Sequence, residues 1–244
     1  MIKRLVPAAL ALTAAFAMTG SAFAQDAAPA APQTPTITFM VDGPDGKVPR
    51  EARLTVDFDQ AHDLENILLL DLSNGRRVAI RLMPDWAPAH VERIKLLARQ
   101  GFYDGNKFHR VIDGFMAQTG DPTGTGQGGS DLPDLTAEFN PLPHVRGTVS
   151  MARAQDKNSA NSQFFIVFYP RFSLDKNYTN FGRVIAGMDA VDTIERGEPP
   201  ANPTYIVQAS IASDNKPQKM PPAPSAAPAN TLNLSGSVLT PQGN

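Results

Sequence analysis

The chain has 244 residues, of which 42% are hydrophobic and 19% are charged, and its formal net charge is −2. This composition is typical of a soluble globular protein, and polar, proline-rich stretches at both termini favour one domain of about 150 residues over two. No basic run accompanies the aromatic residues, so we expect no nucleic-acid partner.

The first residues have the pattern of a secretory signal peptide. A positive start (Lys3, Arg4) precedes an apolar run, and Ala22-Phe23-Ala24 is a small-x-small cleavage site. We therefore predict a signal peptide over residues 1–24, with no stable membrane span after its removal. A membrane anchor is the alternative, but the apolar run is shorter than the roughly 20 residues that cross a bilayer. With no cysteine for lipid attachment, a soluble protein of a bacterial periplasm is the simplest expectation.

Residues 25–64 are predicted to be a linker and an N-terminal extension. Residues 25–35 are rich in alanine and proline, as in a disordered linker. Weak alternation then indicates a strand at residues 36–41, a turn at residues 43–46 and a second strand at residues 54–58.

Residues 65–213 carry the elements of a folded domain. The predicted strands in this region, besides those of a central hairpin, are residues 67–72, 77–83, 147–151, 162–168, 180–185 and 205–212. A helix is predicted from Pro88 to just before Gly101, and a shorter one over residues 188–195. Many short strands with two helices favour an antiparallel barrel or sandwich. Residues 214–244, rich in Pro, Ala, Ser and Asn, are predicted to be a disordered tail.

The central hairpin is predicted within residues 108–121, where β-branched and aromatic residues flank Asp113-Gly114. A two-residue loop would pair Arg110 with Ala117. A three-residue loop pairs Arg110 with Gln118 and Ile112 with Met116, so that a cation, an amide and two apolar groups converge on one face. A guanidinium beside apolar surface needs a partner, and we interpret this face as a site.

Other chemistry has little support in the sequence. The glycine-rich run at residues 124–130 is followed by polar, proline-containing sequence and not by a helix, which argues against a phosphate-binding loop. The four histidines are scattered without cysteine partners, so we expect no metal and no cofactor. His109, on the hairpin face opposite Arg110, is interpreted as a structural hydrogen-bonding residue. There is no Gly-x-Ser-x-Gly elbow for a serine hydrolase.

Three segments resemble one known family. The first segment is Phe108-His109-Arg110-Val111-Ile112-Asp113-Gly114-Phe115-Met116-Ala117-Gln118-Thr119-Gly120-Asp121. The other two are Gly147-Thr148-Val149-Ser150-Met151-Ala152 and Ser162-Gln163-Phe164-Phe165-Ile166. Together they are similar to the motifs of the cyclophilin-type peptidyl-prolyl cis-trans isomerases. The likeness extends from about Glu65 to about Ser213. It implies a mainly β fold, a closed eight-stranded antiparallel barrel capped by two α-helices.

The resemblance also implies an activity and its partners. We expect a monomeric isomerase that accelerates rotation of Xaa-Pro bonds in folding exported proteins, without a covalent step. Its partners would be proline-containing unfolded or extended polypeptides.

Site residues follow from motif position. Arg110 would donate to the prolyl amide, and Gln118 would orient Arg110 or bind the substrate backbone. The residues expected to bind substrate are Phe115, Met116, Ala152, Arg153, Gln163, Phe165, Leu174 and Tyr178. Gln163 is included because it shares a strand face with Phe165. Taken alone, Phe165 and Met116 on strands are more often core than ligand-facing, and Arg110 could equally be part of a surface ion pair.

The chain departs from the family pattern in three places. Ser173 stands where many members have an aromatic residue, Tyr178 where they often have histidine, and Arg153 where asparagine is common. Because serine cannot replace an indole that packs and donates a hydrogen bond, we expect weak binding of cyclosporin-type cyclic peptides. Arg153 should matter little if its main chain binds the peptide.

Two other functions remain open from the sequence. The same surface could belong to a non-catalytic module or chaperone that binds proline-containing segments. The proline-rich tails could instead make the chain a structural envelope protein.

Overall fold

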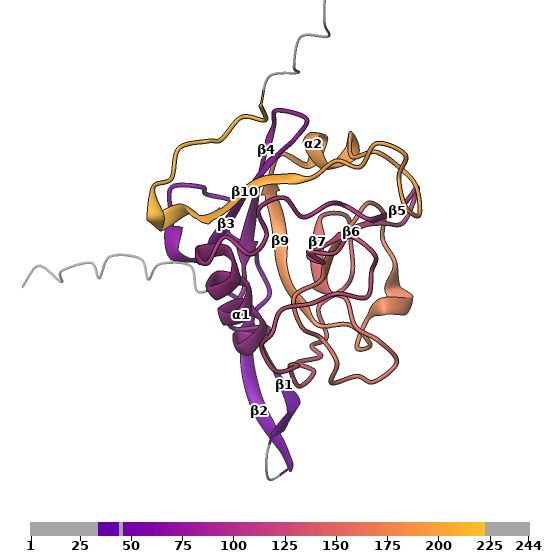
Figure 1. Cartoon of the computed structure of the whole chain (residues 1–244). Helices are drawn as coiled ribbons and strands as arrows, with labels where there is room; N and C mark the ends of the chain where they lie inside the picture. Colours follow the sequence, from indigo (N-terminus) through magenta and orange to yellow (C-terminus); the bar gives the residue numbers. More distant parts are fainter. Residues whose placement is uncertain (1–33, 44–45, 223–244) are drawn as a thin grey trace, which may run out of the picture. The chain divides into compact units, whose positions relative to one another are not determined.

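The computed structural model describes residues 34–43 and 46–222. The predicted signal peptide, most of the predicted linker and the end of the predicted tail lie outside the described residues. The described part contains a two-stranded sheet and an eight-stranded sheet, both antiparallel, with two α-helices (Figure 1). The mainly β class, the eight strands and the two helices agree with the expectation from sequence.

The elements lie close to their predicted positions. The strands are β1 (Thr36–Gly43), β2 (Gly46–Arg53), β3 (Ile67–Leu72), β4 (Arg77–Leu82), β5 (Arg110–Ile112), β6 (Met116–Thr119), β7 (Thr148–Met151), β8 (Phe164–Val167), β9 (Asn180–Ala186) and β10 (Ile206–Ile211). The helices are α1 (Pro88–Arg99) and α2 (Met188–Asp192). As predicted, α1 begins at a proline. Its buried apolar residues are Val91, Ile94, Leu97 and Ala98.

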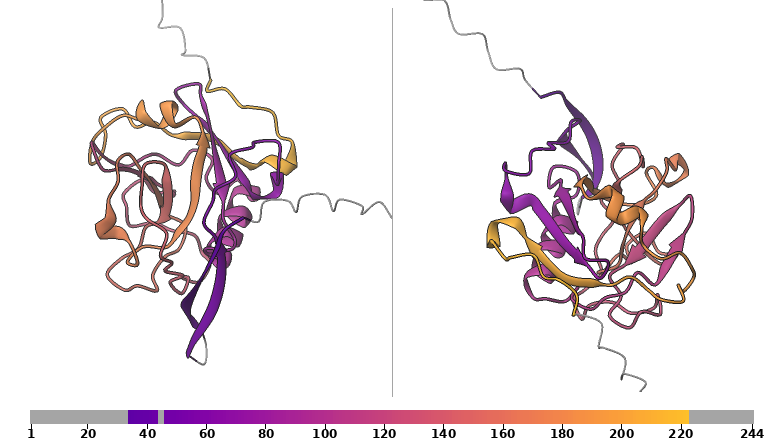
Figure 2. Two further views of the ribbon diagram at one scale, coloured as in Figure 1. Left: turned by 180° about the vertical axis from the view of Figure 1, so that it is seen from behind. Right: turned by 90° about the horizontal axis from the view of Figure 1, so that it is seen from above.

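The eight-stranded sheet is an open, strongly curled half-barrel, and the expectation of a closed barrel was wrong. Its strand order is β10-β3-β4-β9-β7-β8-β6-β5, so β10 and β5 are the two edges. The irregular segment before β5 lies against β10 through single backbone bonds, such as Gly105 N–H to Ile206 O at 2.7 Å and Phe108 N–H to Thr204 O at 2.8 Å. Since β5 has only three residues, no continuous ladder closes the sheet. Figure 2 shows the curl from behind and from above.

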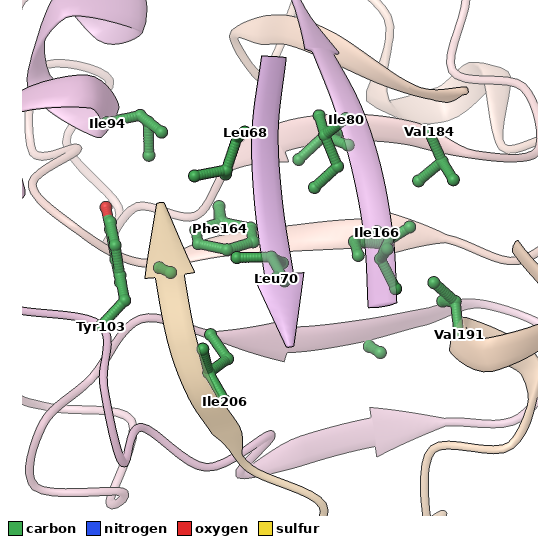
Figure 3. Close-up of a cluster of buried hydrophobic side chains, with 14 of the residues drawn as sticks. Leu68, Leu70, Ile80, Ile94, Tyr103, Phe164, Ile166, Val184, Val191 and Ile206 are labelled. Atoms are coloured by element: carbon green, nitrogen blue, oxygen red, sulfur yellow. The ribbon is translucent and has the colours of Figure 1, made fainter. Parts of the chain in front are cut away.

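The main core fills the inside of this curl. Side chains from β3, β4, β8, β9 and β10 point toward one another and toward both helices (Figure 3). Phe164 lies at its centre, with edge-to-face contacts to Tyr103 at 5.5 Å and to Phe181 at 6.3 Å between ring centroids. Apolar burial and such ring contacts hold the sheet in its curved form.

The N-terminal extension differs from the prediction in its second strand. Strand β2 is residues 46–53, whereas residues 54–58, predicted as a strand, form an irregular segment. Arg81 of β4, only 2% exposed, explains this. Its guanidinium donates to the carbonyl oxygens of Asp57, Asp59, His62 and Asp63 at 2.7–3.1 Å, so that these carbonyls are not available to a sheet ladder.

The first residues of the tail that was predicted to be disordered lie within the described part of the chain. After a short 3-10 turn at Ala212–Asp214, residues 215–222 lie along the edge of the eight-stranded sheet. The backbone N–H of Lys219 donates to Asp71 Oδ2 at 2.7 Å, and Gln208 Nε2 donates to the carbonyl of Pro217 at 3.0 Å.

Candidate active site

A row of side chains crosses three neighbouring strands. Arg110 of β5 pairs with Gln118 of β6, which pairs with Phe165 of β8. The register within the hairpin confirms the three-residue loop, with Ile112 opposite Met116. Directly paired residues project from the same face of a sheet. The guanidinium, the amide and the ring therefore lie together on the outer face of the half-barrel, because Phe164 and Ile166 of the same strand point into the main core.

This face forms a hollow of about 250 Å³. Its lining residues are Arg110, Phe115, Met116, Gln118, Ala152, Arg153, Phe165, Leu174 and Tyr178, all of them predicted from the sequence. The floor is apolar, since Met116, Phe165 and Leu174 are 1%, 4% and 8% exposed and pack with Val167 as a cluster separate from the main core. We call this hollow the proline hollow, after the ring that the resemblance of the sequence leads us to expect there.

Aromatic and cationic side chains build its wall. The Tyr178 ring meets Phe165 edge-to-face, with ring centroids 5.6 Å apart, and the Arg153 guanidinium lies 4.8 Å from the Tyr178 centroid. Arg153 Nε also donates to the carbonyl of Asn177 at 3.1 Å. The side chain of Arg153 is thus part of the wall, a role that the sequence analysis missed.

Gln163 lies outside the proline hollow. It lines a neighbouring hollow of about 520 Å³ on the other side of Gln118, and its Oε1 accepts a hydrogen bond from Gln118 Nε2 at 2.9 Å. Sharing a strand face with Phe165 was therefore not enough to place it in the proline hollow. Within the described ranges no hydrogen bond joins Gln118 to Arg110, and the two predicted roles of Gln118 stay predictions.

The glycine-rich loop is folded around a carboxylate. Asp121, which has no exposed surface, accepts backbone N–H bonds from Thr123, Thr125, Gly126 and Gly128 at 2.6–3.1 Å. A Cβ at Gly128 would lie 2.1 Å from Asp121 Oδ1, so that position requires glycine. Burial alone would raise the pKa of Asp121, but the hydrogen bonds from Thr123, Gly128 and Gly126 outweigh burial and lower the pKa to about 2. The backbone N–H groups of this loop therefore bind an anion of the chain itself, the Asp121 carboxylate.

The same loop is fixed to the strand of the site. Gln163 Nε2 donates to the carbonyl oxygens of Gly126 at 3.1 Å and Gly128 at 2.7 Å. Asp121 thus positions the loop, the loop holds Gln163, and Gln163 holds Gln118 at the edge of the proline hollow.

Behind the proline hollow lies a serine–histidine–aspartate arrangement that the sequence analysis missed. Ser150 Oγ lies 2.8 Å from His144 Nε2, and His144 Nδ1 lies 2.8 Å from Asp175 Oδ1. Ser150 is fully buried, so it has no access to a substrate carbonyl. Burial lowers the pKa of His144, in spite of Asp175, which favours a neutral ring between the two partners. The ring stacks on Phe165 at 6.5 Å, and the arrangement supports the floor of the hollow.

Two further positions named from the sequence lie near the site. His109 is 6% exposed and lies next to the Lys107 backbone and the Gln163 side chain, but in the described part of the chain neither ring nitrogen has a partner in ordinary hydrogen-bond geometry, so its hydrogen-bonding role stays a prediction. Its pKa is lowered chiefly by burial, which favours a neutral ring. Near Ser173, the aromatic Phe172 is 63% exposed and does not line the proline hollow.

Neither a metal-binding cluster nor a membrane-spanning helix is found in the part of the chain that the structure describes. In residues 34–43 and 46–222 no three His, Asp or Glu side chains are grouped so that they could hold a metal ion. Neither helix in these ranges is long and apolar enough to span a bilayer.

Comparison with known families decides the relationship. The model of the family "Cyclophilin type peptidyl-prolyl cis-trans isomerase/CLD" matches residues 68–212. The chain belongs to the cyclophilin family. A probable peptidyl-prolyl cis-trans isomerase of Brucella suis is 50% identical to this cyclophilin over 172 residues, which cover 64% of this chain and 87% of the relative. Peptidyl-prolyl cis-trans isomerase B of Bacillus subtilis is 42% identical over 128 residues, covering 52% and 89% of the two chains.

Solved structures show the same relationship. Cyclophilin AquaCyp293 from Hirschia baltica has a TM-score of 0.59 and 31% identity, covering 65% of this chain and 78% of its own. A Cryptosporidium parvum cyclophilin crystallised in the presence of the dipeptide Ala-Pro has a TM-score of 0.55 and 29% identity, covering 59% and 98%. This cyclophilin is therefore an enzyme of the peptidyl-prolyl isomerase class.

Proposed function

We propose that this cyclophilin accelerates Xaa-Pro rotation by binding the twisted amide between Arg110 and the proline hollow. The observation that carries the proposal is the position of Arg110, on the rim of an apolar hollow of about 250 Å³ whose floor is Met116, Phe165 and Leu174. A pyrrolidine ring is apolar and compact, and the hollow offers it a dry surface next to a fixed cation.

The reaction needs no nucleophile. Rotation about the prolyl bond has a barrier of about 18–20 kcal/mol because amide conjugation is lost, and unaided it takes tens of seconds or more. An ordinary turnover of about 10 per second requires lowering that barrier by roughly 4 kcal/mol. A site achieves this by binding the twisted form better than either planar form.

In this proposal Arg110 makes the site bind the twisted amide more tightly than the planar forms. As conjugation is lost, the lone pair of the prolyl nitrogen becomes able to accept a hydrogen bond, which it cannot do in the planar amide. An arginine stays charged at any ordinary pH, and its planar fork can reach the nitrogen and the neighbouring carbonyl together. The cation then favours the transition state over both ground states.

The remaining site residues bind and align the peptide. Phe115, with the floor residues, would hold the ring, and Tyr178 would cover it. The main chain at Ala152 and Arg153 would bind the extended polypeptide, and Gln118 would accept or donate a backbone hydrogen bond. Gln163 would act through Gln118, whose amide donates a hydrogen bond to it.

We further propose that the natural substrates are proline-containing, unfolded or extended polypeptides outside the cytoplasm, where slow prolyl isomerisation limits folding. The support is the signal-peptide pattern of residues 1–24. Fractionation of cells expressing the full chain should recover in the periplasm a mature protein that begins at Gln25. Recovery of the intact 244-residue chain in the cytoplasm would contradict export.

A folding assay distinguishes an isomerase from a binding chaperone. The substrate is a denatured protein whose slow refolding phase is set by a prolyl bond, and its aggregation is followed in parallel. We expect Arg110→Ala to reduce acceleration of the slow phase by about 100-fold or more, because a principal transition-state donor is lost. A matched surface change, Arg76→Ala, should leave acceleration unchanged.

The opposite result would identify a chaperone. If Arg110→Ala still suppresses aggregation as well as the wild type, and neither protein accelerates the slow phase, the surface binds proline segments without isomerising them.

A further inference from the structure

Arg110 has an unexpected partner, Glu198, which lies 88 residues further along the chain. Arg110 Nε donates to Glu198 Oε2 at 2.7 Å. The two Nη atoms have no hydrogen-bond partner in residues 34–43 and 46–222. The bond therefore uses the inner nitrogen of the guanidinium and leaves the outer fork available.

The backbone next to Glu198 is fixed to the backbone next to Arg110. Val111 and Gly197 exchange two hydrogen bonds, Val111 N–H to Gly197 O at 2.8 Å and Gly197 N–H to Val111 O at 2.9 Å. Gly197 has a φ of +143°, and a Cβ there would lie 2.6 Å from Pro200 Cα, so only glycine fits. This pairing places Glu198 beside the outer edge of β5.

The segment is held on both sides of Glu198. Before it, the Arg196 guanidinium lies 4.2 Å from the Phe168 ring centroid and donates to the carbonyl of Asp192 at 2.8 Å. After it, Pro199 and Pro200 have restricted φ angles. The carboxylate of Glu198 is therefore attached to an ordered segment, unlike most exposed acidic side chains.

Glu198 does not line the proline hollow. Arg110 lines two hollows, the proline hollow and a larger one of about 670 Å³, and Glu198 lines only the larger. The carboxylate thus holds the guanidinium from the side that does not receive the proline ring.

We propose that Glu198 is a positioning residue for Arg110, which fixes the guanidinium so that its outer nitrogens face the prolyl amide. This inference rests on the proposed role of Arg110. Because Arg110 and Glu198 side chains are 43% and 50% exposed, their ion pair contributes little to stability. Catalysis is more sensitive, since a displacement of about 1 Å in a reacting group can reduce the rate by about 100-fold.

Two variants of Glu198 separate position from charge. Glu198→Ala removes the acceptor, and we expect kcat for a short Xaa-Pro peptide to fall about 10-fold with KM nearly unchanged. Glu198→Gln removes the charge but keeps an oxygen that can accept from Arg110 Nε, so it should recover most of this loss. The control is Glu195→Ala, an exposed glutamate in the same segment whose side chain is not bonded to Arg110. The melting temperatures of all three should stay close to that of the wild type.

Salt provides a second readout that separates the hydrogen bond from the charge. Screening at 1 M salt weakens the Coulomb attraction of an exposed ion pair but leaves the acceptor oxygen in place, so the kcat of the wild type should fall only to about that of Glu198→Gln and stay above that of Glu198→Ala.

These experiments distinguish failure of the positioning role of Glu198 from failure of the proposed role of Arg110. An inactive wild type, or an active Arg110→Ala, would refute the role of Arg110 itself. If Arg110→Ala is inactive but Glu198→Ala equals or exceeds the wild type, only the positioning role is overturned. A kcat of Glu198→Ala above that of the wild type would mean that the Glu198 carboxylate competes with substrate for the Arg110 guanidinium.

Discussion

At the scale of single residues, Asp121 shapes the loop beside the site without lining the proline hollow. Its carboxylate accepts hydrogen bonds from backbone N–H groups and from the Thr123 and Thr125 hydroxyls. A set made only of hydrogen-bond donors stabilises the ionised form of the Asp121 carboxyl group and not the protonated form. The loop that holds Gln163 therefore depends on one charge.

This dependence predicts the behaviour of Asp121→Asn. The amide would place an NH₂ group against N–H donors, so we expect the free energy of unfolding at pH 7 to fall by about 2 kcal/mol, as for lost hydrogen bonds to a charged group. Asp131→Asn, an exposed change in the same loop, is the control. Urea denaturation measures both, and equal losses would contradict the role of Asp121.

The same residue predicts a dependence on pH. Its pKa in the folded protein, about 2, is below the ordinary 3.8, so its stabilisation is complete above about pH 4 and is lost as the pH falls toward 2. The difference in unfolding free energy between wild type and Asp121→Asn should therefore shrink over that interval. A difference that stays constant down to pH 2.5 would refute this linkage.

At the scale of elements, the hairpin β1–β2 is the main addition to the part that the family model matches. It covers Trp86, the single tryptophan, which is fully buried and donates its indole N–H to the carbonyl of Arg53 at 2.9 Å. Ala52 packs against Trp86, and Arg50 Nη1 pairs with Glu138 Oε1 at 3.1 Å. Glu138 also bonds His90 of α1, so the hairpin is tied to the helix.

A matched pair of substitutions tests this packing through tryptophan fluorescence. Ala52→Asp places a charge against the indole, so the emission should shift to longer wavelength and the unfolding free energy should fall by about 2–4 kcal/mol. Met40→Asp introduces the same residue on the exposed face of β1, where Met40 is 53% exposed, and should change neither. Equal shifts in both variants would show that the hairpin does not cover Trp86.

Local sequence patterns predicted the elements whose stabilising contacts are made within the same short stretch of chain. The hairpin register at Arg110 follows from turn chemistry and side-chain alternation, and the start of α1 follows from Pro88. The segment at residues 54–58 was predicted wrongly because the carbonyl of Asp57, like three carbonyls that follow the segment, binds Arg81, a residue of another strand. The partners Glu198 of Arg110 and Asp175 of His144 could not be predicted for the same reason, since each pair is brought together only by the fold.

At the scale of the whole described part, the sheet curls without closing. A short β5 at the edge leaves the outer flank of Arg110 open to the segment that carries Glu198. In a continuous barrel that flank would be occupied by another strand. The incorrect expectation of a closed barrel came from the resemblance to a family. The residues themselves indicated only a barrel or a sandwich, because the ends of secondary-structure elements are difficult to predict from local sequence patterns.

The isomerase and its arginine can be tested together by NMR exchange spectroscopy on a short Ala-Pro peptide, without a coupled protease. With a catalytic amount of wild-type protein, we expect exchange cross-peaks between the cis and trans forms at rates of about 10 per second, far above the uncatalysed rate. Arg110→Ala should reduce this exchange at least 100-fold while its melting temperature stays unchanged. Exchange that is equally fast in Arg110→Ala, or no faster with the wild type than without protein, would contradict the mechanism.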